Sequence, residues 1–307
     1  MAQIIAEPTG PAASSAGKGL GGLWDRQLPH YPPTSARYRY LALTVLATIV
    51  LYYELYIPGA VATHIIADYD MGFTMFVTVS IIGNLLGAFA SLVAGLADRW
   101  GRANLVVGGL FITGLLVLFA LPHAPNTLTY TIAFGALSIV EGLILVATPA
   151  LVRDFSPQVG RASAMAFWTM GPVLGSLVVT LVSSNTLDAH PNWRFQFYVC
   201  GTVGLIVAVL AMLGLKELSP SLRDQLMVDL EDQALIEAKA RGIDTEAAAQ
   251  NHWKQMAHLN IIGPAVGISL FLLFYYIAVG FFVVYFATNF GYTEQRGNSL
   301  ANWYWIT

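Results

Sequence analysis

Residues 95–102 read Gly95-Leu96-Ala97-Asp98-Arg99-Trp100-Gly101-Arg102, a charged loop between two long apolar stretches, Phe73–Ala97 and Ala103–Leu121. A bilayer core about 30 Å thick needs about 20 apolar residues for a helix to cross it, and both stretches are of that order. Neither shows the alternation of apolar and polar residues that a membrane-spanning strand requires. The loop is therefore predicted to join two membrane-spanning helices.

The same apolar pattern recurs along the chain. Five further stretches are long enough to span: Tyr40–Thr63, Leu128–Leu151, Ala162–Ser184, Phe195–Leu215 and Ile261–Ala287. An eighth begins near Leu300. Of the 307 residues 56% are hydrophobic and only 11% are charged, whereas soluble domains carry about 25% charged residues. We therefore expect an all-α integral membrane protein and no ordinary soluble enzyme.

Charge and cysteine content exclude other classes of protein. The net charge of −3 leaves no basic patch for nucleic acid. The single cysteine, Cys200, excludes a disulfide framework and a cysteine-based metal site. His64, His123 and His190 fall in loops at one side of the predicted bundle, where we expect them to be solvated and to form no metal site.

The basic residues of the short loops predict the orientation. Seven lie on the side of the N-terminus: Arg37, Arg39, Arg99, Arg102, Arg153, Arg161 and Lys216. Two lie on the other side: Arg194 and Arg296. Because cytoplasmic loops are enriched in Lys and Arg, we expect a multi-pass protein of the cell membrane (plasma or inner) with a cytoplasmic N-terminus.

Composition divides the chain into four segments. We expect a disordered cytoplasmic tail over residues 1–36 and a six-helix transmembrane bundle over 37–216. Residues 217–258 are rich in charge, carry leucines at helical spacing, and predict a cytoplasmic linker with two surface helices. Residues 259–307 are then the beginning of a second transmembrane bundle.

The charged loop resembles the pattern Gly-x-x-x-Asp-Arg-x-Gly-Arg-Arg/Lys of the major facilitator superfamily. Four residues match it: Asp98, Arg99, Gly101 and Arg102. Ala94 and Ala103 depart from it. The resemblance implies six spans, a cytoplasmic connection and six more spans. We therefore expect a chain truncated after the seventh span, without the C-terminal half that a complete cavity needs.

The resemblance also implies roles for individual residues. Asp98 would cap a helix of the second half, and Arg102 would pair with an acid at the end of the fourth span, for which Asp154 is well placed. These contacts would close a cytoplasmic gate. Gly171-Pro172 followed by Gly175 resembles part of a fifth-span motif found in antiporters.

Two carboxylates, Glu54 and Glu141, lie well inside predicted spans that contain no Lys or Arg. Ionisable groups at such depth are expensive and are functional candidates. In the resembled fold the first and fourth spans line the central cavity, so we expect both acids to face a common cavity. A shielded carboxyl favours its neutral form. It could therefore take up a proton and lose it when the cavity opens.

Tyrosines accompany these acids. Tyr53 and Tyr56 flank Glu54, and Tyr275 and Tyr276 lie in the aromatic seventh span, so their hydroxyls could orient a polar substrate. For most rings of the seventh span, packing or lipid contact is the competing interpretation. Asn289 near the outer end could join a periplasmic gate.

Small residues and prolines are expected to shape the helices. Gly83, Gly87 and Gly95 fall on one face of the second span. In the resembled family this helix slides against the opposite half, and plain packing is the alternative. Pro58 and Pro172 lack the N–H of a regular helix and can bend their spans.

Together these features predict a secondary active transporter that works by alternating access, is no enzyme and needs no cofactor. Its expected partners are a small organic substrate, protons and the lipid bilayer. Two cavity acids without a base fit proton symport of a metabolite or sugar. Proton-coupled multidrug efflux is the alternative, followed by a membrane sensor that does not transport.

Overall fold

The computed structural model describes residues 25–92, 95, 100–157, 160–223, 225, 236–237, 240 and 258–306. Within them seven helices are long and apolar enough to cross a membrane. They are α1 (Thr34–Ala60), α3 (Phe73–Leu92), α5 with its π-helical continuation η2 (Arg102–Leu115 and Leu116–Ala120), α6 (Thr127–Phe155), α7 (Arg161–Thr186), α8 (Arg194–Gly214) and α12 (Leu259–Phe290). The prediction of an all-α membrane bundle with seven spans is confirmed.

Four shorter elements complete the described fold. Helix α2 (Ala62–Asp68) follows α1, and α13 (Glu294–Ile306) follows α12. The strands β1 (Gln27–Leu28) and β2 (Glu217–Leu218) pair in parallel. Helix α13 begins six residues before the predicted start near Leu300, because the Thr293 hydroxyl accepts the backbone N–H of Arg296 at 3.3 Å and caps the first turn.

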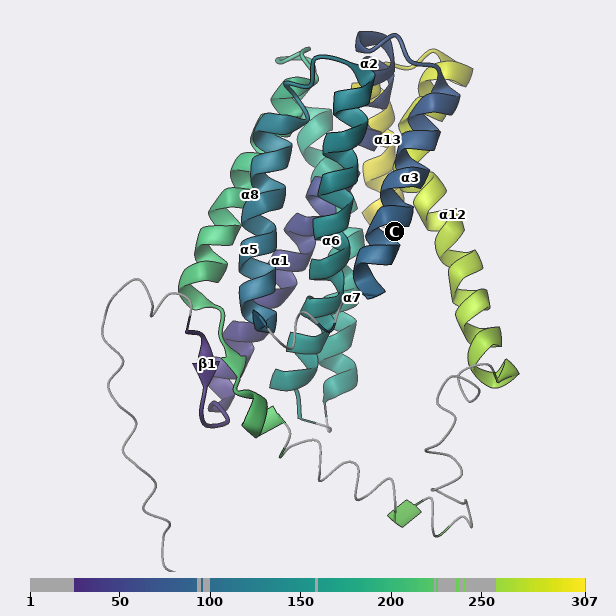
Figure 1. Ribbon diagram of the computed structural model, residues 1–307. Coiled ribbons are helices and arrows are strands. Elements are labelled where there is room, and N and C mark those ends of the chain that lie inside the picture. The colour runs from purple at the N-terminus through teal and green to yellow at the C-terminus, as the bar shows by residue number, and fades with distance from the viewer. Residues whose placement is uncertain are drawn as a thin grey trace, which may run out of the picture.

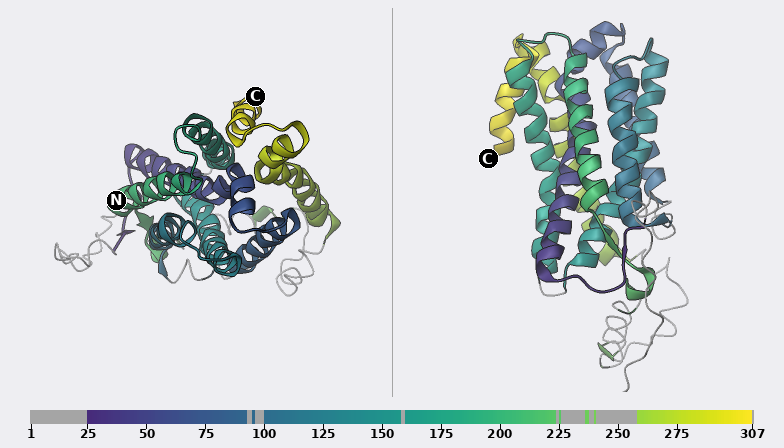
Figure 2. Two further views of the ribbon diagram at one scale, coloured as in Figure 1. Left: turned by 90° about the horizontal axis from the view of Figure 1, so that it is seen from above. Right: turned by 90° about the vertical axis from the view of Figure 1, so that its left-hand side faces the viewer.

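The first six spans form one bundle around α1, which packs against α7, α8 and α6 (Figures 1 and 2). Helix α3 packs against α6, and α5 packs against both α6 and α8. Gly83 and Gly87 produce the close approach of α3 to α6, because a side chain on either would collide with Phe134 or Ser138. In this chain Gly83 and Gly87 thus pack within one half, and a side chain on Gly95 would meet no atom within 4 Å.

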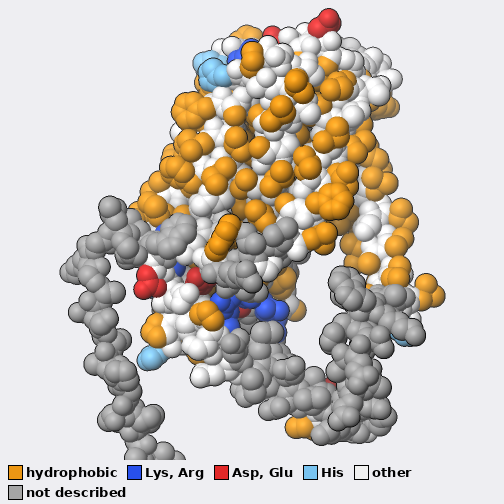
Figure 3. Space-filling view, viewed as in Figure 1, with side chains coloured by type: hydrophobic (Ala, Val, Ile, Leu, Met, Phe, Trp, Pro, Cys, Tyr) orange, Lys and Arg blue, Asp and Glu red, His pale blue; other side chains and the backbone are white. Residues whose placement is uncertain are grey.

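Charged side chains gather at the two ends of the bundle, and an apolar belt lies between them (Figure 3). We call one end the basic end. It is defined by Arg26, Arg37, Arg39, Arg102, Arg153, Arg161, Lys216 and Arg223, near the starts of α1, α5 and α7 and the ends of α6 and α8. We call the other the opposite end, where α2 and the start of α13 lie (Figure 1).

Residues 25–36 contain β1 and the beginning of α1, where the sequence predicted a disordered tail. Arg26 is buried, and its guanidinium donates to the Leu215 carbonyl at 3.1 Å and to Asn104 Oδ1 at 3.0 Å. Leu215 terminates α8, and a cation at a helix C-terminus is stabilised by the helix dipole. The rest of the tail lies outside the described residues.

The linker begins as β2 rather than as a helix. Glu217 is buried there, and its carboxylate accepts the backbone N–H of Ala103 at 3.3 Å in the first turn of α5. Burial raises the pKa of this carboxyl, and the backbone donors oppose that rise. Gly101 has φ 90°, and a side chain there would collide with Glu217, so the turn requires glycine. Most of both predicted linker helices lies outside the described residues.

Candidate functional site

A cavity of about 310 Å³ lies between α12 and the first bundle, among α1, α3 and α6. We call it the central cavity. Its hydrogen-bonding side chains are Tyr56, Ser80, Asn84 and Tyr276. The remaining described residues that line it are apolar or glycine, so none carries a charge.

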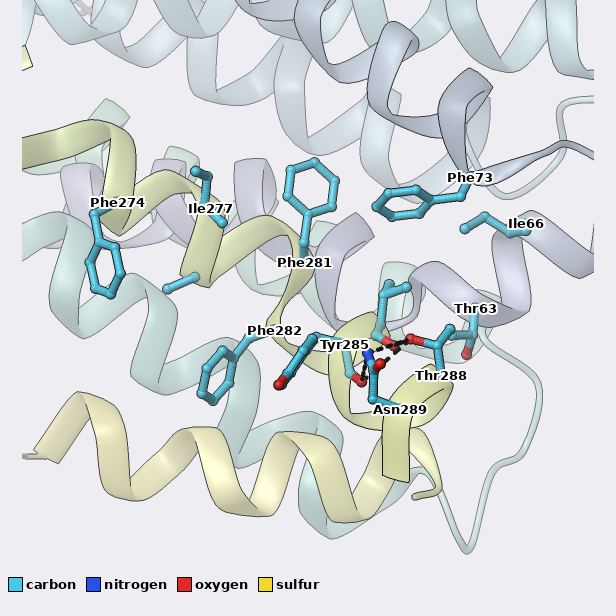
Figure 4. A pocket seen from close by; sticks show the side chains of 12 residues that line it. Thr63, Ile66, Phe73, Phe274, Ile277, Phe281, Phe282, Tyr285, Thr288 and Asn289 are labelled. Atoms are coloured by element: carbon cyan, nitrogen blue, oxygen red, sulfur yellow. Dashed lines mark hydrogen bonds between the residues drawn. The ribbon is translucent and has the colours of Figure 1, made fainter. Parts of the chain in front are cut away.

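A second cavity, of about 720 Å³, lies at the opposite end between α12 and the α2–α3 corner (Figure 4). Phe281 lines both cavities, and its ring lies 5.7 Å from that of Phe73. Asn289 lines this cavity but donates to Tyr285 O and Thr288 Oγ1, both on its own helix (Figure 4). The structure therefore shows no gate contact of Asn289 across the two halves among the described residues.

Three of the predicted tyrosines meet where α1, α7 and α12 converge. The Tyr56 ring lies 6.3 Å from that of Tyr275 and 6.5 Å from that of Tyr276. The Tyr275 hydroxyl lies 2.9 Å from Ser176 Oγ. Tyr53 points elsewhere: it is buried in the core of the first bundle, near Cys200, which corrects its assignment to the cavity.

Helix α7 approaches α1 closely beside this cluster. A side chain on Gly171 would collide with Thr48, and one on Gly175 would collide with Tyr52. Pro172 lies between the two glycines, inside the helix. These small residues let α7 bring Ser176 to the hydroxyl of Tyr275.

Glu54 and Glu141 are both buried inside the first bundle. The charge of Glu54 acts on the Glu141 carboxyl. No oxygen of either carboxylate has a hydrogen-bond partner with good geometry among the described residues. Both groups are thus buried acids of the kind that functional sites in membranes contain.

These acids do not line the central cavity, so the expectation of a common cavity is corrected. The Glu54 carboxylate points toward α8, where Gly204 leaves room for it: a side chain on Gly204 would collide with Glu54 Oε1. The rotation of α1 turns Tyr56 toward α12 and Glu54 toward α8. Tyr56 therefore lines the central cavity, whereas Glu54, two residues earlier, faces the interior of the first bundle.

Of the four motif residues, the structure describes Gly101 and Arg102. Arg102 Nη1 lies 2.7 Å from each carboxylate oxygen of Asp154 and joins α5 to α6. Asp98 and Arg99 lie outside the described residues. The ion pair connects two helices of the same half.

Sequence reasoning missed three features of the site. Ser80 and Asn84 line the central cavity from α3, and a polar amide in an apolar span was the available signal for Asn84. His64 lies in α2 rather than in a loop, and its side chain, 46% exposed, contacts Glu294 of α13. No local pattern marks that contact, because 230 residues separate its partners.

The family model of the Major Facilitator Superfamily matches residues 44–306, which is most of the chain. The chain belongs to this family. Members of the Major Facilitator Superfamily are transporters, a class distinct from enzymes, and the seven candidate spans make this one a multi-pass membrane protein.

Relatives with curated names carry different functions. The chain is 23% identical over 295 residues to an efflux pump, radE, of Floropilus chiversii, covering 86% of this chain and 51% of the relative. It is 30% identical over 115 residues to sialin of Ovis aries, covering 37% and 23%. It is 27% identical over 145 residues to the quinolone resistance protein NorB of Staphylococcus aureus, covering 46% and 30%. The chain thus spans about half the length, or less, of these relatives.

Solved structures share the fold. A bacterial homolog of the human lysosomal transporter Spinster, in an inward-facing and occupied conformation, matches with a TM-score of 0.65 at 16% identity. The match covers 87% of this chain and 57% of that one. A D-xylose-proton symporter matches with a TM-score of 0.62 at 16% identity, covering 88% and 66%.

Proposed function

We propose that this protein is a proton-coupled secondary transporter that carries a small uncharged organic solute through the central cavity. One observation carries the proposal: an aromatic, uncharged cavity lies between α12 and the first bundle, while two buried acids, Glu54 and Glu141, lie within that bundle. The first feature suits solute binding. The second suits proton binding.

The lining of the central cavity indicates the substrate class. Aromatic rings offer flat apolar faces, and Tyr56, Tyr276, Ser80 and Asn84 offer neutral hydrogen-bonding groups. A charged solute would lose its hydration without gaining an opposite charge. The cavity therefore fits a neutral sugar-like or aromatic molecule.

The buried acids supply a candidate proton site. An ionised carboxylate without a partner costs several kcal/mol in such surroundings, and two neighbouring carboxylates oppose ionisation of both. We expect the Glu54–Glu141 pair to hold protons in this arrangement. Pro58 cannot donate to the Glu54 carbonyl, so α1 can bend beside the pair and admit water.

The contacts of α12 support alternating access. Ala278, Val283 and Val284 are buried against the other helices. Toward the basic end α12 diverges from α3 (Figure 1). If the basic end is cytoplasmic, as its Lys and Arg content favours, this arrangement is open to the inside.

Efflux is the second candidate. The apolar, aromatic lining favours it, as do two relatives whose names are an efflux pump and a quinolone resistance protein. Symport of a sugar-like solute is favoured by the hydroxyl and amide groups of the lining and by the fold shared with a D-xylose-proton symporter. Both candidates use the same cavity and the same acids.

Flux into proteoliposomes separates the candidates. A panel of radiolabelled neutral sugars, neutral aromatic compounds, organic anions and cationic dyes would be tested with and without a pH gradient. Movement of a neutral solute in the same direction as the protons supports symport. Movement in the opposite direction supports antiport. A protein that accumulates only organic anions, or nothing, contradicts the proposal.

A further inference from the structure

At the opposite end, one carboxylate joins the last described helix to the first bundle. Glu294 begins α13 and is only 4% exposed. It accepts the backbone N–H groups of Thr63 and His64 at 2.8 and 3.1 Å, in the first turn of α2. The Thr63 hydroxyl and His64 Nδ1 also contact it. Four groups of the first half thus converge on one side chain of the second.

Neutral bonds surround this contact. Asn298 of α13 donates to the Ala60 carbonyl at 2.9 Å, and Gln295 donates to the Ser184 carbonyl at 3.0 Å. Asn302 donates to Ser184 Oγ at 3.0 Å. These three bonds also join α13 to α1 and α7, but none contains a group that titrates near neutral pH. The pH response of the joint therefore depends on His64 and Glu294.

Other charged groups at this end are engaged elsewhere or exposed. Asp68, on the same helix as His64, pairs with Arg194 of α8 at 2.6 Å. Asp70 follows α2, Asp188 and His190 follow α7, and Arg296 lies exposed on α13. Tyr285 and Asn289 of α12, which line the cavity at this end together with Thr63, carry no charge. Glu294 is the charged group that acts on the pKa of His64.

The sign of the pH effect follows from this contact. The bond to Glu294 raises the pKa of His64 above its ordinary value of about 6.5, and partial burial opposes the rise. A group with a raised pKa in the joined state stabilises that state fully below its ordinary pKa. The stabilisation is lost as the pH increases through the raised value.

We propose that Glu294 and His64 form a latch that holds the opposite end closed when the compartment facing it is acidic. Opening that end requires α13 to leave α2, which exposes the Glu294 carboxylate and breaks all four of its contacts. A protonated His64 opposes this separation more strongly than a neutral one. The latch rests on the proposed transport function, because it assigns a regulator to one of the two closed states that transport requires.

Distances between spin labels test the latch directly. Labels would be attached at Pro125→Cys, before α6, and Tyr292→Cys, between α12 and α13, in a Cys200→Ala background. Pulsed electron paramagnetic resonance in liposomes would be recorded at about pH 5.5 and about pH 8, on both sides of the ordinary histidine range. The long-distance population should grow with pH, by at most tenfold per pH unit, which is the limit for one proton.

Three variants decide the mechanism. His64→Gln should show the long distance at both pH values, and His64→Arg, which keeps a cation, should show the short distance at both. His190→Gln is the matched control, since its ring stacks on Phe195 at the same end of the bundle, and it should keep the wild-type response. If His64→Gln fails to fold, His64→Arg still decides the question.

Equal distances at both pH values in the wild type, or an unchanged pH response in His64→Arg, would overturn the latch. Solute flux separates this outcome from failure of the proposed function. A pH-dependent distance without flux of any solute would reject transport and keep the latch. Proton-coupled flux with distances that do not change with pH would support transport and reject the latch.

Discussion

The ion pair between Arg102 and Asp154 makes a quantitative prediction about stability. Asp154→Asn removes the negative charge and keeps an oxygen that can accept a hydrogen bond. In the structure Arg102 Nη1 lies 2.7 Å from both Asp154 oxygens, and the two side chains are only 10% and 6% exposed. Arg153 and Arg223 also act on the Asp154 carboxyl. The variant therefore leaves several cations without their shared anion.

The magnitude follows from this burial. Two unit charges 2.7 Å apart attract by about 6 kcal/mol at an effective dielectric constant of about 20. Burial opposes this attraction, because it disfavours the charged form of Asp154 by more than the nearby arginines favour it. Removing one partner of a buried pair still costs about 3–5 kcal/mol, because the other charge is left unpaired. Because Asn keeps an acceptor, we expect about 3 kcal/mol. At about 2–4 °C per kcal/mol, Tm should decrease by about 6–12 °C.

Thermal unfolding in detergent, followed by tryptophan fluorescence, measures this loss. The double variant Arg102→Gln/Asp154→Asn should lose less stability than the two single variants combined, because it also removes the Arg102 cation that Asp154→Asn leaves without its closest partner. The matched control is Asp68→Asn. It breaks the pair with Arg194. Because the Asp68 and Arg194 side chains are 39% and 30% exposed, the loss should be about 1 kcal/mol or less. Equal Tm values for Asp154→Asn and Asp68→Asn would refute the reasoning.

Three further predictions concern the site and the turn beside it. Gly204→Ala should displace the Glu54 carboxylate, cost about 1–3 kcal/mol and reduce proton-driven flux, whereas Gly108→Ala, with open space around it, should leave flux unchanged. Tyr276→Phe should weaken solute binding by about fivefold, the value of one neutral hydrogen bond, in a binding assay; wild-type affinity would exclude its hydroxyl from the site. Gly101→Ala should lower Tm, because φ 90° strains alanine and its Cβ would collide with a buried carboxylate; an unchanged Tm would contradict this account of the turn.

The spans could be predicted because lipid imposes a simple rule. A helix needs about 20 apolar residues to cross, and that length is visible in the sequence without any knowledge of packing. The observed helix ends differ from the predicted ones, because contacts of single side chains determine where a helix begins and ends. Thr293 caps α13 earlier than apolar content predicts. Arg26 orders the chain before α1 by binding the end of α8, a partner 189 residues away.

The site was harder to predict because it depends on how each helix is rotated. Depth along α1 places Glu54 near the middle of the span, but depth does not determine which neighbour it faces. Because Gly204 has no side chain, α8 leaves room for the Glu54 carboxylate, while Tyr56, two residues later, faces α12. The contact between His64 and Glu294 depends on the docking of α13, which no local sequence pattern encodes.

The central claim is that the buried acid pair couples transport to protons. Once a transported solute is identified, Glu54→Gln in proteoliposomes tests it most directly, because the amide matches the carboxyl in shape but cannot release a proton. The account predicts that flux driven by a pH gradient is abolished while solute counterflow, which needs no net proton movement, continues. Gradient-driven flux at the wild-type rate in Glu54→Gln would contradict it.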